Sequence, residues 1–375
     1  MLLDRIVLHE IRLPLKEPFR ISSGEIRERR VMLLELHDAS GASAWSECVA
    51  GEAPNYSSET IDTAWIAITN WVSPRVLGKK FGHPGEVHEV LERDFRGHNM
   101  AKAAVEMGLW ALAATMAGEP LARFIGGTRR EIATGISLGI QKNPQALIDK
   151  ARAALAEGYQ KVKIKIGPGH DVEWIAAARD ALGPEAHLMA DANNAYTLDD
   201  IDRLIALDDF GLMMIEQPLP HDDIVRHAEL QKRLRTPICL DESITSLDRA
   251  QDMVTLDSGR IVNIKPGRVG GYASAIAIHN FCQERRVPVW CGGMLESGVG
   301  RAYNVALASL PNFVLPGDVS PSARYWTRDI VLPEWTMNDG MVHVPLEKPG
   351  IGVDVDSNRV ASLAVRSAEQ SLRRA

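Results

Sequence analysis

Residues 187–191 (HLMAD), 212–216 (LMMIE) and 237–241 (PICLD) are three short apolar runs that each end in an acidic residue. Apolar runs of this length are typical of buried β-strands. Their acidic ends are 25 residues apart, which leaves room between two strands for one helix and two short loops. The pattern therefore predicts successive strand–helix units, and such units form parallel sheets.

Strands of the same kind continue along the chain in both directions. Helices with recognisable starts lie between them, because Asn143 and Pro144 begin one helix and Ser246 begins another. Eight repeats favour a closed parallel barrel over an open sheet, so the predicted fold class is α/β, a modified (β/α) barrel of the TIM type. The predicted strands are residues 135–140, 161–166, 187–191, 212–216, 237–241, 260–264, 287–291 and 312–315.

The residues on either side of the barrel follow other patterns. Residues 1–130 combine alternating strands with Ala- and Trp-containing helices, which predicts an α+β amino-terminal capping domain. We expect residues 131–320 to form the barrel. Residues 321–375 contain no further strand–helix repeat, and we expect this segment to pack back on the capping domain.

The composition is that of an ordinary globular protein. The chain has 42 Lys and Arg against 49 Asp and Glu, a formal net charge of −7, and 45% hydrophobic residues. A negative net charge does not favour binding to nucleic acid or to an anionic membrane. Charged residues interrupt the first ten positions, where a secretory signal needs an apolar run, and no run reaches transmembrane length. We expect a soluble, cytoplasmic protein.

Asp191, Glu216 and Asp241 end three neighbouring strands, and barrel active sites lie at the carboxyl ends of the strands. Three carboxylates that converge without a cation repel one another, and a hard divalent ion relieves that repulsion. Because the set contains no His or Cys, it favours Mg²⁺ or Mn²⁺ over zinc. The alternative is that each carboxylate caps the following helix, which is common for a single residue but less expected for three at one interval.

Lysines occupy two further strand ends. In residues 161–166 (KVKIKI), strand alternation sends Lys163 and Lys165 to one face, which points into the barrel if the isoleucines pack against the helices. Lys265 follows the sixth strand, on the opposite side of an eight-stranded barrel, and should face Lys165 across the metal. A surface position is credible for Lys161, because lysine is rarely buried.

A metal ion flanked by two amines suits removal of a weakly acidic proton next to a carboxylate. The metal binds the substrate carboxylate and neutralises the charge that develops on it, while the lysines move the proton. A lysine is a base only when it is neutral. Nearby cations such as Arg268 lower the pKa of a lysine and the carboxylates raise it, so the two effects oppose each other.

Ser137 lies in residues 135–139 (GISLG), which match the nucleophile motif of serine hydrolases. That motif requires a sharp turn that leads directly into a helix, whereas Ser137 falls inside the first barrel strand. We interpret Ser137 as an inward-facing residue that either lines the substrate site or packs in the barrel.

Several motifs resemble those of the enolase superfamily, muconate lactonizing enzyme subgroup, over essentially the whole chain. Beside the Lys-x-Lys strand, the subgroup features are residues 191–193 (DAN), 216–218 (EQP), 240–243 (LDES) and 268–271 (RVGG). Residues 291–301 (CGGMLESGVGR) and 317–326 (GDVSPSARYW) are similar to those of the N-succinylamino acid racemase and o-succinylbenzoate synthase group.

The resemblance implies a role for each main candidate. It implies that Asp191, Glu216 and Asp241 bind the metal, that Lys165 and Lys265 are the acid/base pair, and that Lys163 supports them. It also implies that residues 18–24 (PFRISSG) close over the substrate, although an ordinary hairpin turn is as good an interpretation of that stretch. The predicted substrate-binding or supporting residues are Asn193, Ser137, Phe19, Arg268, Leu295 and Glu242.

The leading hypothesis is a metal-dependent racemase of N-acylated, most simply N-succinylated, amino acids. The alternative is o-succinylbenzoate synthase, a dehydratase of menaquinone synthesis, and one enzyme of this group can have both activities. A hypothesis from another class is an inactive barrel with a binding role. We expect a small-molecule carboxylate substrate and a homo-oligomer.

Overall fold

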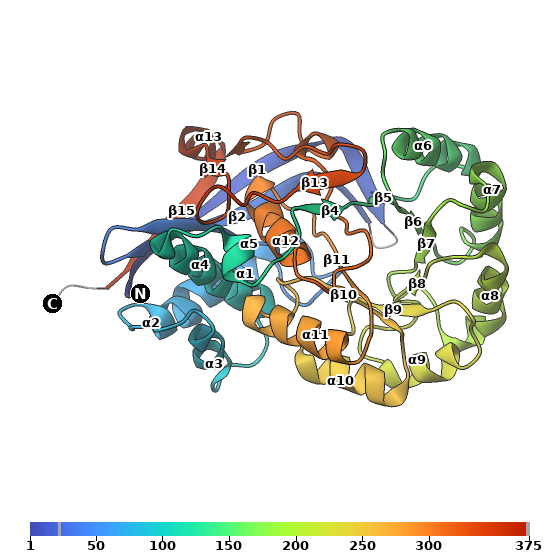
Figure 1. Cartoon of the computed structure of the whole chain (residues 1–375), viewed down its shortest axis with the longest axis horizontal. Coiled ribbons are helices and arrows are strands. Elements are labelled where there is room, and N and C mark those ends of the chain that lie inside the picture. The colour runs from blue at the N-terminus through green and yellow to red at the C-terminus, as the bar shows by residue number, and fades with distance from the viewer. Residues whose placement is uncertain (22–23, 373–375) are drawn as a thin grey trace.

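The computed structural model of the chain describes residues 1–21 and 24–372 (Figure 1). Its centre is a parallel sheet in which each strand lies beside the one that precedes it in the sequence. This topology confirms the prediction of a parallel α/β barrel. The strands are β5 (Ile136–Leu138), β6 (Val162–Lys165), β7 (Leu188–Asp191), β8 (Ile215–Glu216), β9 (Ile238–Leu240), β10 (Ile261–Ile264) and β11 (Val289–Cys291).

The predicted eighth strand, residues 312–315, does not form a regular strand. Phe313 makes an isolated parallel bridge to Val289 of β11, and Gly317 makes another to Thr134 on the approach to β5. The segment therefore joins the two edges of the sheet at single residues and closes the barrel. The backbone N–H groups of Phe313 and Val314 bond locally to Leu310 O at 3.3 Å and Asn312 O at 2.8 Å, so they are not available to a ladder with β11. Pro316, which follows, has no N–H to extend the pairing.

Most of the helices that follow the strands form an arc around the outside of the sheet (Figure 1), and the last of them lies beside the helices of the amino-terminal part of the chain. Their predicted starts are confirmed at Asn143, whose Oδ1 accepts from Ala146 N at 2.8 Å, and at Ser246, which caps the helix before β10. The helices are α6 (Pro144–Ala156), α7 (Val172–Leu182), α8 (Ile201–Ala206), α9 (Ile224–Gln231), α10 (Leu247–Leu256), α11 (Tyr272–Glu284) and α12 (Gly298–Ala308).

The amino-terminal part of the chain forms an antiparallel sheet covered by helices. The sheet has the order β15-β1-β2-β3, so the strand nearest the carboxyl terminus pairs with the first strand of the chain. Its strands are β1 (Leu3–Ile21), β2 (Gly24–Asp38), β3 (Ser43–Cys48) and β15 (Ala364–Ser371). Its principal helices are α1 (Ile61–Ala67), α3 (Glu86–Glu92) and α4 (Asn99–Ala117).

Shorter elements lie within this region and between it and the barrel. Between β11 and β15 the chain forms two small antiparallel pairs, one of which joins β13 to a strand just before the barrel. These elements are η1 (Ile68–Val72), α2 (Ser73–Val76), α5 (Leu121–Phe124), β4 (Glu131–Ala133), β12 (Val331–Leu332), β13 (Met341–His343), β14 (Asp354–Val355) and α13 (Ser357–Leu363).

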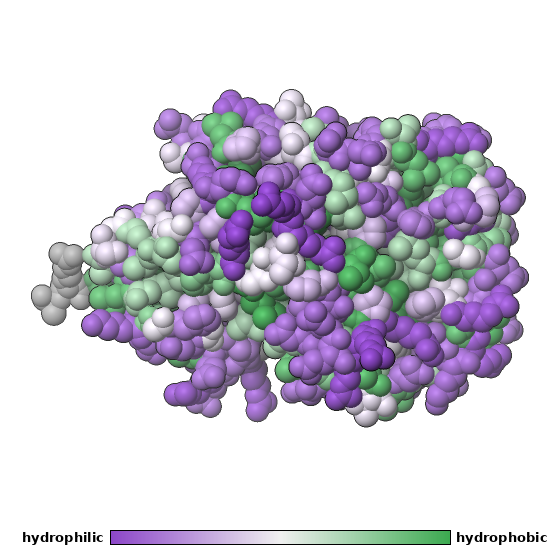
Figure 2. Space-filling view, viewed as in Figure 1, coloured by the Kyte–Doolittle hydropathy of each residue, from purple (hydrophilic) through white to green (hydrophobic). Residues whose placement is uncertain are grey.

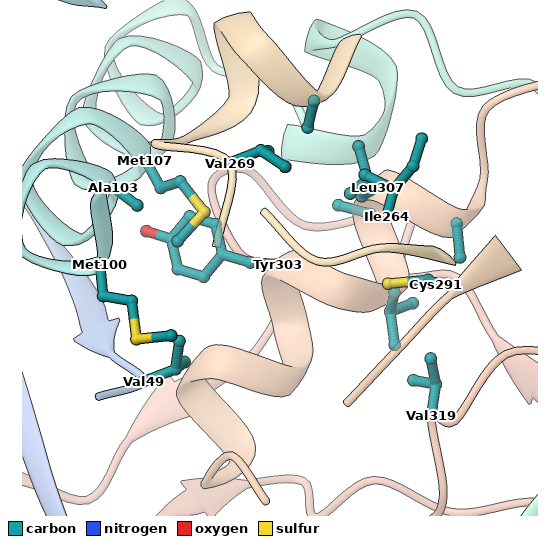
Figure 3. Close-up of a cluster of buried hydrophobic side chains, with 14 of the residues drawn as sticks. Val49, Met100, Ala103, Met107, Ile264, Val269, Cys291, Tyr303, Leu307 and Val319 are labelled. Carbon is teal, nitrogen blue, oxygen red and sulfur yellow. The ribbon is translucent and has the colours of Figure 1, made fainter. Parts of the chain in front are cut away.

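Apolar side chains from the capping region and the barrel form one continuous core. Figure 3 shows Met107 of α4 beside Val269 and Tyr303, which come from the barrel, and Met100 of α4 beside Val49. Contacts that bury side chains of both regions stabilise their relative placement, since each buried apolar side chain contributes about 1.5–3 kcal/mol.

Glu106 of α4 adds a polar link at the same interface. Its Oε2 accepts from the backbone N of Tyr272 at 2.7 Å and its Oε1 from that of Ala273 at 2.9 Å, so it caps the first turn of α11. The Oε1 also accepts from Trp110 Nε1 at 2.7 Å. Glu106 is fully buried, and burial raises its pKa to about 7.

The surface is mostly polar. The face drawn in Figure 2 is largely hydrophilic, with apolar side chains scattered over it in small patches. Among the described residues, no helix combines the length and the apolar character needed to cross a bilayer.

We expect Glu106→Ala to lower the free energy of unfolding by about 3 kcal/mol, because buried N–H groups of α11 lose their acceptor. Urea unfolding followed by tryptophan fluorescence measures the change. Glu229→Ala, which removes an exposed carboxylate from α9, is the control and should change stability by less than about 0.5 kcal/mol. Equal effects of the two variants would contradict the capping role of Glu106.

Candidate active site

Three buried carboxylates lie side by side at the carboxyl ends of the barrel strands. Asp191 is the last residue of β7 and pairs in register with Glu216, the last residue of β8. Glu216 pairs in turn with Cys239 of β9, so that Asp241 follows directly after the end of that strand. Each of the three side chains is at most 1% exposed. The sequence spacing thus produces the expected row of acids.

Lys163 lies in the middle of this row. Its Nζ is 3.1 Å from Asp191 Oδ2, 3.2 Å from Glu216 Oε2 and 2.6 Å from Asp318 Oδ2. Lys165, one side-chain layer nearer the mouth of the barrel, places its Nζ 2.7 Å from Asp191 Oδ2. The inward orientation expected for both lysines is therefore observed.

The other end of the row is held by a second group of cations. Lys265 Nζ lies 2.8 Å from Asp241 Oδ2, and Arg268 pairs with the other oxygen of that carboxylate. Tyr56, from the capping region, donates its hydroxyl to Asp241 Oδ1 at 2.8 Å, and its ring centroid lies 4.4 Å from Lys265 Nζ. Two neighbouring cations of the barrel and a hydroxyl from the distant capping region thus converge on one carboxylate.

The electrostatics follow from burial and from this pairing. Burial alone would raise the pKa of Asp191 and Asp241, but the adjacent cations lower both, and that of Asp241 falls to about 2. Burial raises the pKa of Glu216 well above its usual range, and the carboxylates of its two neighbours raise it further. Burial opposes the charge on Lys265, but Asp241 holds its pKa above the ordinary value.

The donor set fits a hard divalent cation. Among the described residues, no three Asp, Glu, His or Cys side chains are arranged ready to hold a metal ion, and Lys163 contacts two of the carboxylates. The charges of Asp191 and Asp241 add to the effect of burial in raising the pKa of Glu216, as expected for three acids in one row. A site of three oxygen-donor carboxylates matches the preference of Mg²⁺ or Mn²⁺.

Most of the predicted site residues line one cavity of about 130 Å³ between the barrel and the capping region. Phe19 reaches it from β1, and Leu295 reaches it from the loop after β11, where its backbone has a positive φ of 58°. Ser137 lies inside β5 and faces the cavity, not a strand-to-helix turn. The predicted residues that line this cavity are Lys163, Lys165, Lys265, Asn193, Ser137, Phe19 and Leu295.

Two further parts of the prediction fall elsewhere. The loop predicted for residues 18–24 includes Ser22 and Ser23, which lie outside the described residues. Arg268 and Glu242 do not line this cavity and border a larger one of about 850 Å³ instead. Both act behind the site, because Arg268 binds Asp241 and Glu242 Oε1 accepts from Asn193 Nδ2 at 3.1 Å. Burial raises the pKa of Glu242 to about 7.

Sequence reasoning missed several side chains that contact the row of acids. Asp318 contacts Lys163, Asn263 donates to Glu216 Oε1 at 2.7 Å, and Tyr56 binds Asp241. Asn263 precedes Lys265 by two residues, so strand alternation could have identified it. Asp318 lies in the quoted motif of residues 317–326, but nothing in that motif indicated its partner.

Lys161 corrects the expectation of a surface position. Its side chain is 0% exposed, and its Nζ lies 3.3 Å from Asp318 Oδ1 and 3.7 Å from the centroid of the Trp290 ring. The same alternation that turns Lys163 inward also turns Lys161 inward. The general rarity of buried lysine did not predict this position. A carboxylate and an aromatic face offset part of the cost of burial, although burial still lowers the pKa of Lys161.

Comparison with known families identifies the chain. Residues 5–126 match the N-terminal domain of the mandelate racemase / muconate lactonizing enzyme family, and residues 146–359 match the enolase C-terminal domain-like family. The chain belongs to the mandelate racemase / muconate lactonizing enzyme family of the enolase superfamily.

Individual relatives align with nearly the whole length of the chain. It is 49% identical over 358 residues to an o-succinylbenzoate synthase of Geobacillus kaustophilus, with 96% of this chain and 95% of the relative covered. It is 44% identical over 353 residues to an N-succinylamino acid racemase of Amycolatopsis, with 94% and 95% covered. A solved enolase superfamily structure from Listeria innocua matches with a TM-score of 0.96 at 39% identity and 100% coverage of both chains. These similarities confirm the resemblance stated from the sequence and identify an enzyme of this family.

We expect Asp318→Asn to lower the free energy of unfolding by about 3–5 kcal/mol, because two buried ammonium groups, those of Lys161 and Lys163, lose a charged partner. Denaturant unfolding measures the loss. The control is Asp354→Asn, which breaks an exposed 2.6 Å ion pair with Lys348 and should cost less than about 1 kcal/mol. A cost for Asp318→Asn as small as that of the control would show that Asp318 does not stabilise the buried lysines.

Proposed function

We propose that the protein is a divalent-metal-dependent enzyme that removes the α-proton of a carboxylate substrate, and that it racemises N-succinylamino acids. The observation that carries this proposal is that Lys165 of β6 and Lys265 after β10 line one cavity from opposite parts of the barrel. Racemisation needs a proton carrier on each face of the α-carbon, and two lysines placed in this way supply them.

Asp191, Glu216 and Asp241 would hold Mg²⁺ or Mn²⁺ in this proposal. The metal would supply a positive charge that neutralises the charge developing on the substrate carboxylate as the α-proton leaves. The family membership of the chain and the chemistry of these three buried acids support this assignment.

Side chains of the protein transfer the proton and position the reacting groups. Lys165 takes the proton from one enantiomer and Lys265 returns one on the opposite face, and the reverse reaction exchanges their roles. Lys163 keeps a fixed positive charge beside the acids. Asn193 contacts Lys165 and is itself held by Glu242, so it orients the lysine at the mouth of the site.

Substrate recognition is assigned to the walls of the cavity. Phe19 and Leu295 supply apolar surface, and Ser137 supplies a hydroxyl beside Lys163. We propose that the end of β1 that carries Phe19 closes over the substrate and excludes water. Arg268 acts through Asp241 and Glu242 through Asn193, so both are positioning residues.

o-Succinylbenzoate synthase activity is the second candidate. The identity of 49% to the Geobacillus kaustophilus synthase exceeds the 44% to the Amycolatopsis racemase, which favours this candidate. Dehydration on one face needs a single general acid/base, which Lys165 would provide while Lys265 stabilises charge. A paired assay of racemisation and dehydration on one preparation decides between one activity and both.

A binding role without catalysis is the remote alternative. The presence of all five main residues, three acids and two lysines, argues against it. Exchange of the substrate α-proton with solvent deuterium in the presence of Mg²⁺ distinguishes an enzyme from a binding protein.

The wider organisation is also proposed. We divide the chain into a capping domain (1–130), a barrel domain (131–320) and a segment that returns to the cap (321–375), which the β1–β15 pairing supports. We place the enzyme in the cytoplasm as a homo-oligomer. Exposed Ile66 and Trp71, in α1 and η1, offer apolar surface for a subunit contact.

Chelation with excess EDTA should abolish turnover, and Mg²⁺ or Mn²⁺ should restore it. Glu216→Gln should lower kcat by at least about 100-fold with the fold retained, because it removes a ligand charge without changing side-chain size. Turnover assays and circular dichroism check both results. Full activity after exhaustive chelation would exclude the metal-dependent mechanism.

Substitution of each lysine should affect the α-proton exchange of a different enantiomer. Lys265→Arg keeps a positive charge but cannot act as a base near neutral pH, so racemisation should stop while one enantiomer still exchanges its α-proton with D₂O. Lys165→Arg should exchange only the other enantiomer. Proton NMR in D₂O measures each exchange. The two-base proposal fails if either variant still interconverts the enantiomers.

A further inference from the structure

The guanidinium of Arg29, in β2, is a buried cation in the wall of the active-site cavity. Arg29 is 4% exposed and borders the same cavity as Lys165 and Lys265. Its two terminal nitrogens donate to the backbone oxygens of Val49 and Ala50 at 3.3–3.4 Å, and its Nε has no hydrogen-bond partner. Such long hydrogen bonds satisfy a guanidinium poorly.

The neighbouring arginine shows what a paired guanidinium looks like in the same strand. Arg30 points to the opposite face, where its Nε lies 2.7 Å from Glu10 Oε1 and its terminal nitrogens lie 2.8–2.9 Å from the Asp62 carboxylate. Arg29 has no such partner among the described residues. Glu47 and Glu296 attract it only from longer range, and burial lowers its pKa.

A buried charge without a partner is costly and is retained where a ligand supplies the partner. The cavity has the lysines on its barrel side, Arg29 on its capping side, and apolar side chains such as Ile26, Met294 and Tyr325 in its walls. This arrangement suits a substrate with two anionic ends and an apolar middle. A guanidinium binds a carboxylate through two parallel hydrogen bonds, which makes it selective for that group.

We propose that Arg29 binds the terminal carboxylate of the succinyl group and makes the enzyme selective for succinylated substrates. The inference rests on the proposed function, because an N-succinylamino acid carries this second carboxylate. It holds equally for the synthase candidate, whose product name specifies a succinyl group. Arg29 is then a substrate-binding residue contributed by the capping region.

The competing explanation is that Arg29 only fixes the backbone of Val49 and Ala50. The two explanations differ in what a substrate without the terminal charge should show. N-succinylphenylalanine and its terminal amide, N-succinamylphenylalanine, have the same shape and differ in this one charge. Loss of a purely structural contact would affect both compounds alike.

The test measures racemisation of both compounds by wild type, Arg29→Met and Arg29→Lys, with Arg30→Met as the matched control from the opposite face. For Arg29→Met we expect kcat/KM for the succinyl compound to fall roughly 10- to 100-fold, mainly through KM, and that for the amide to change less than about threefold. Arg29→Lys should show a smaller loss on the succinyl compound alone. Arg30→Met should leave the preference between the two compounds unchanged.

Each result has a definite consequence. Equal losses on both compounds would overturn the inference and leave Arg29 as a structural residue. If Arg29→Met does not fold, an unchanged preference in Arg29→Lys overturns it instead. If the wild type turns over neither these compounds nor the dehydration substrate, the proposed function fails, and this inference fails with it. Turnover by the wild type without any effect of Arg29 on the preference contradicts this inference alone.

Discussion

Mutual repulsion among three carboxylates buried at adjacent strand ends is the constraint on which the rest of the site depends. Asp191, Glu216 and Asp241 are almost inaccessible to water, so their charges need partners within the protein or a bound ion. Lysine side chains of the barrel lie on both sides of this row of carboxylates. Lys163 lies between two of the acids, and Lys265 binds the third. The positions of the cations follow from the positions of the acids.

The same requirement links the capping region to the chemistry. Tyr56 places its hydroxyl on Asp241, and Arg29 brings a cation to the cavity from β2. Cap and barrel must therefore keep a fixed relation for the site to work. Glu106 supports this relation by capping α11 of the barrel from α4. A second buried acid of the capping region, Glu47, does the same for α12 by accepting from Gly300 N at 2.9 Å.

The sequence predicted those parts of the structure that follow from local periodicity. Strand ends repeat at a constant interval, so the row of acids and the inward lysines could be located without coordinates. The predicted eighth strand was wrong because the backbone N–H groups of Phe313 and Val314 bond within their own segment and leave a single bridge to β11. Tyr56 and Asp318 were missed because their partners are far away in sequence, and no local pattern encodes such contacts. The sequence could not single out Arg29, because its distinguishing feature is that no carboxylate among the described residues pairs with its buried guanidinium, and only a structure shows that.

The contacts of Lys163, Lys165 and Lys265 indicate different roles for these three lysines. Lys163 donates to Glu216 Oε2 at 3.2 Å and forms ion pairs with Asp318 and Asp191. An amine accepts a substrate proton only when it is neutral, and three carboxylate partners favour the charged form of Lys163. Among the described residues, Lys165 at the mouth has polar contacts with Asp191 and Asn193, and Lys265 forms an ion pair with Asp241. The mechanism proposed above accordingly assigns proton exchange to the two lysines on opposite sides of the cavity and a fixed charge to the lysine between the acids.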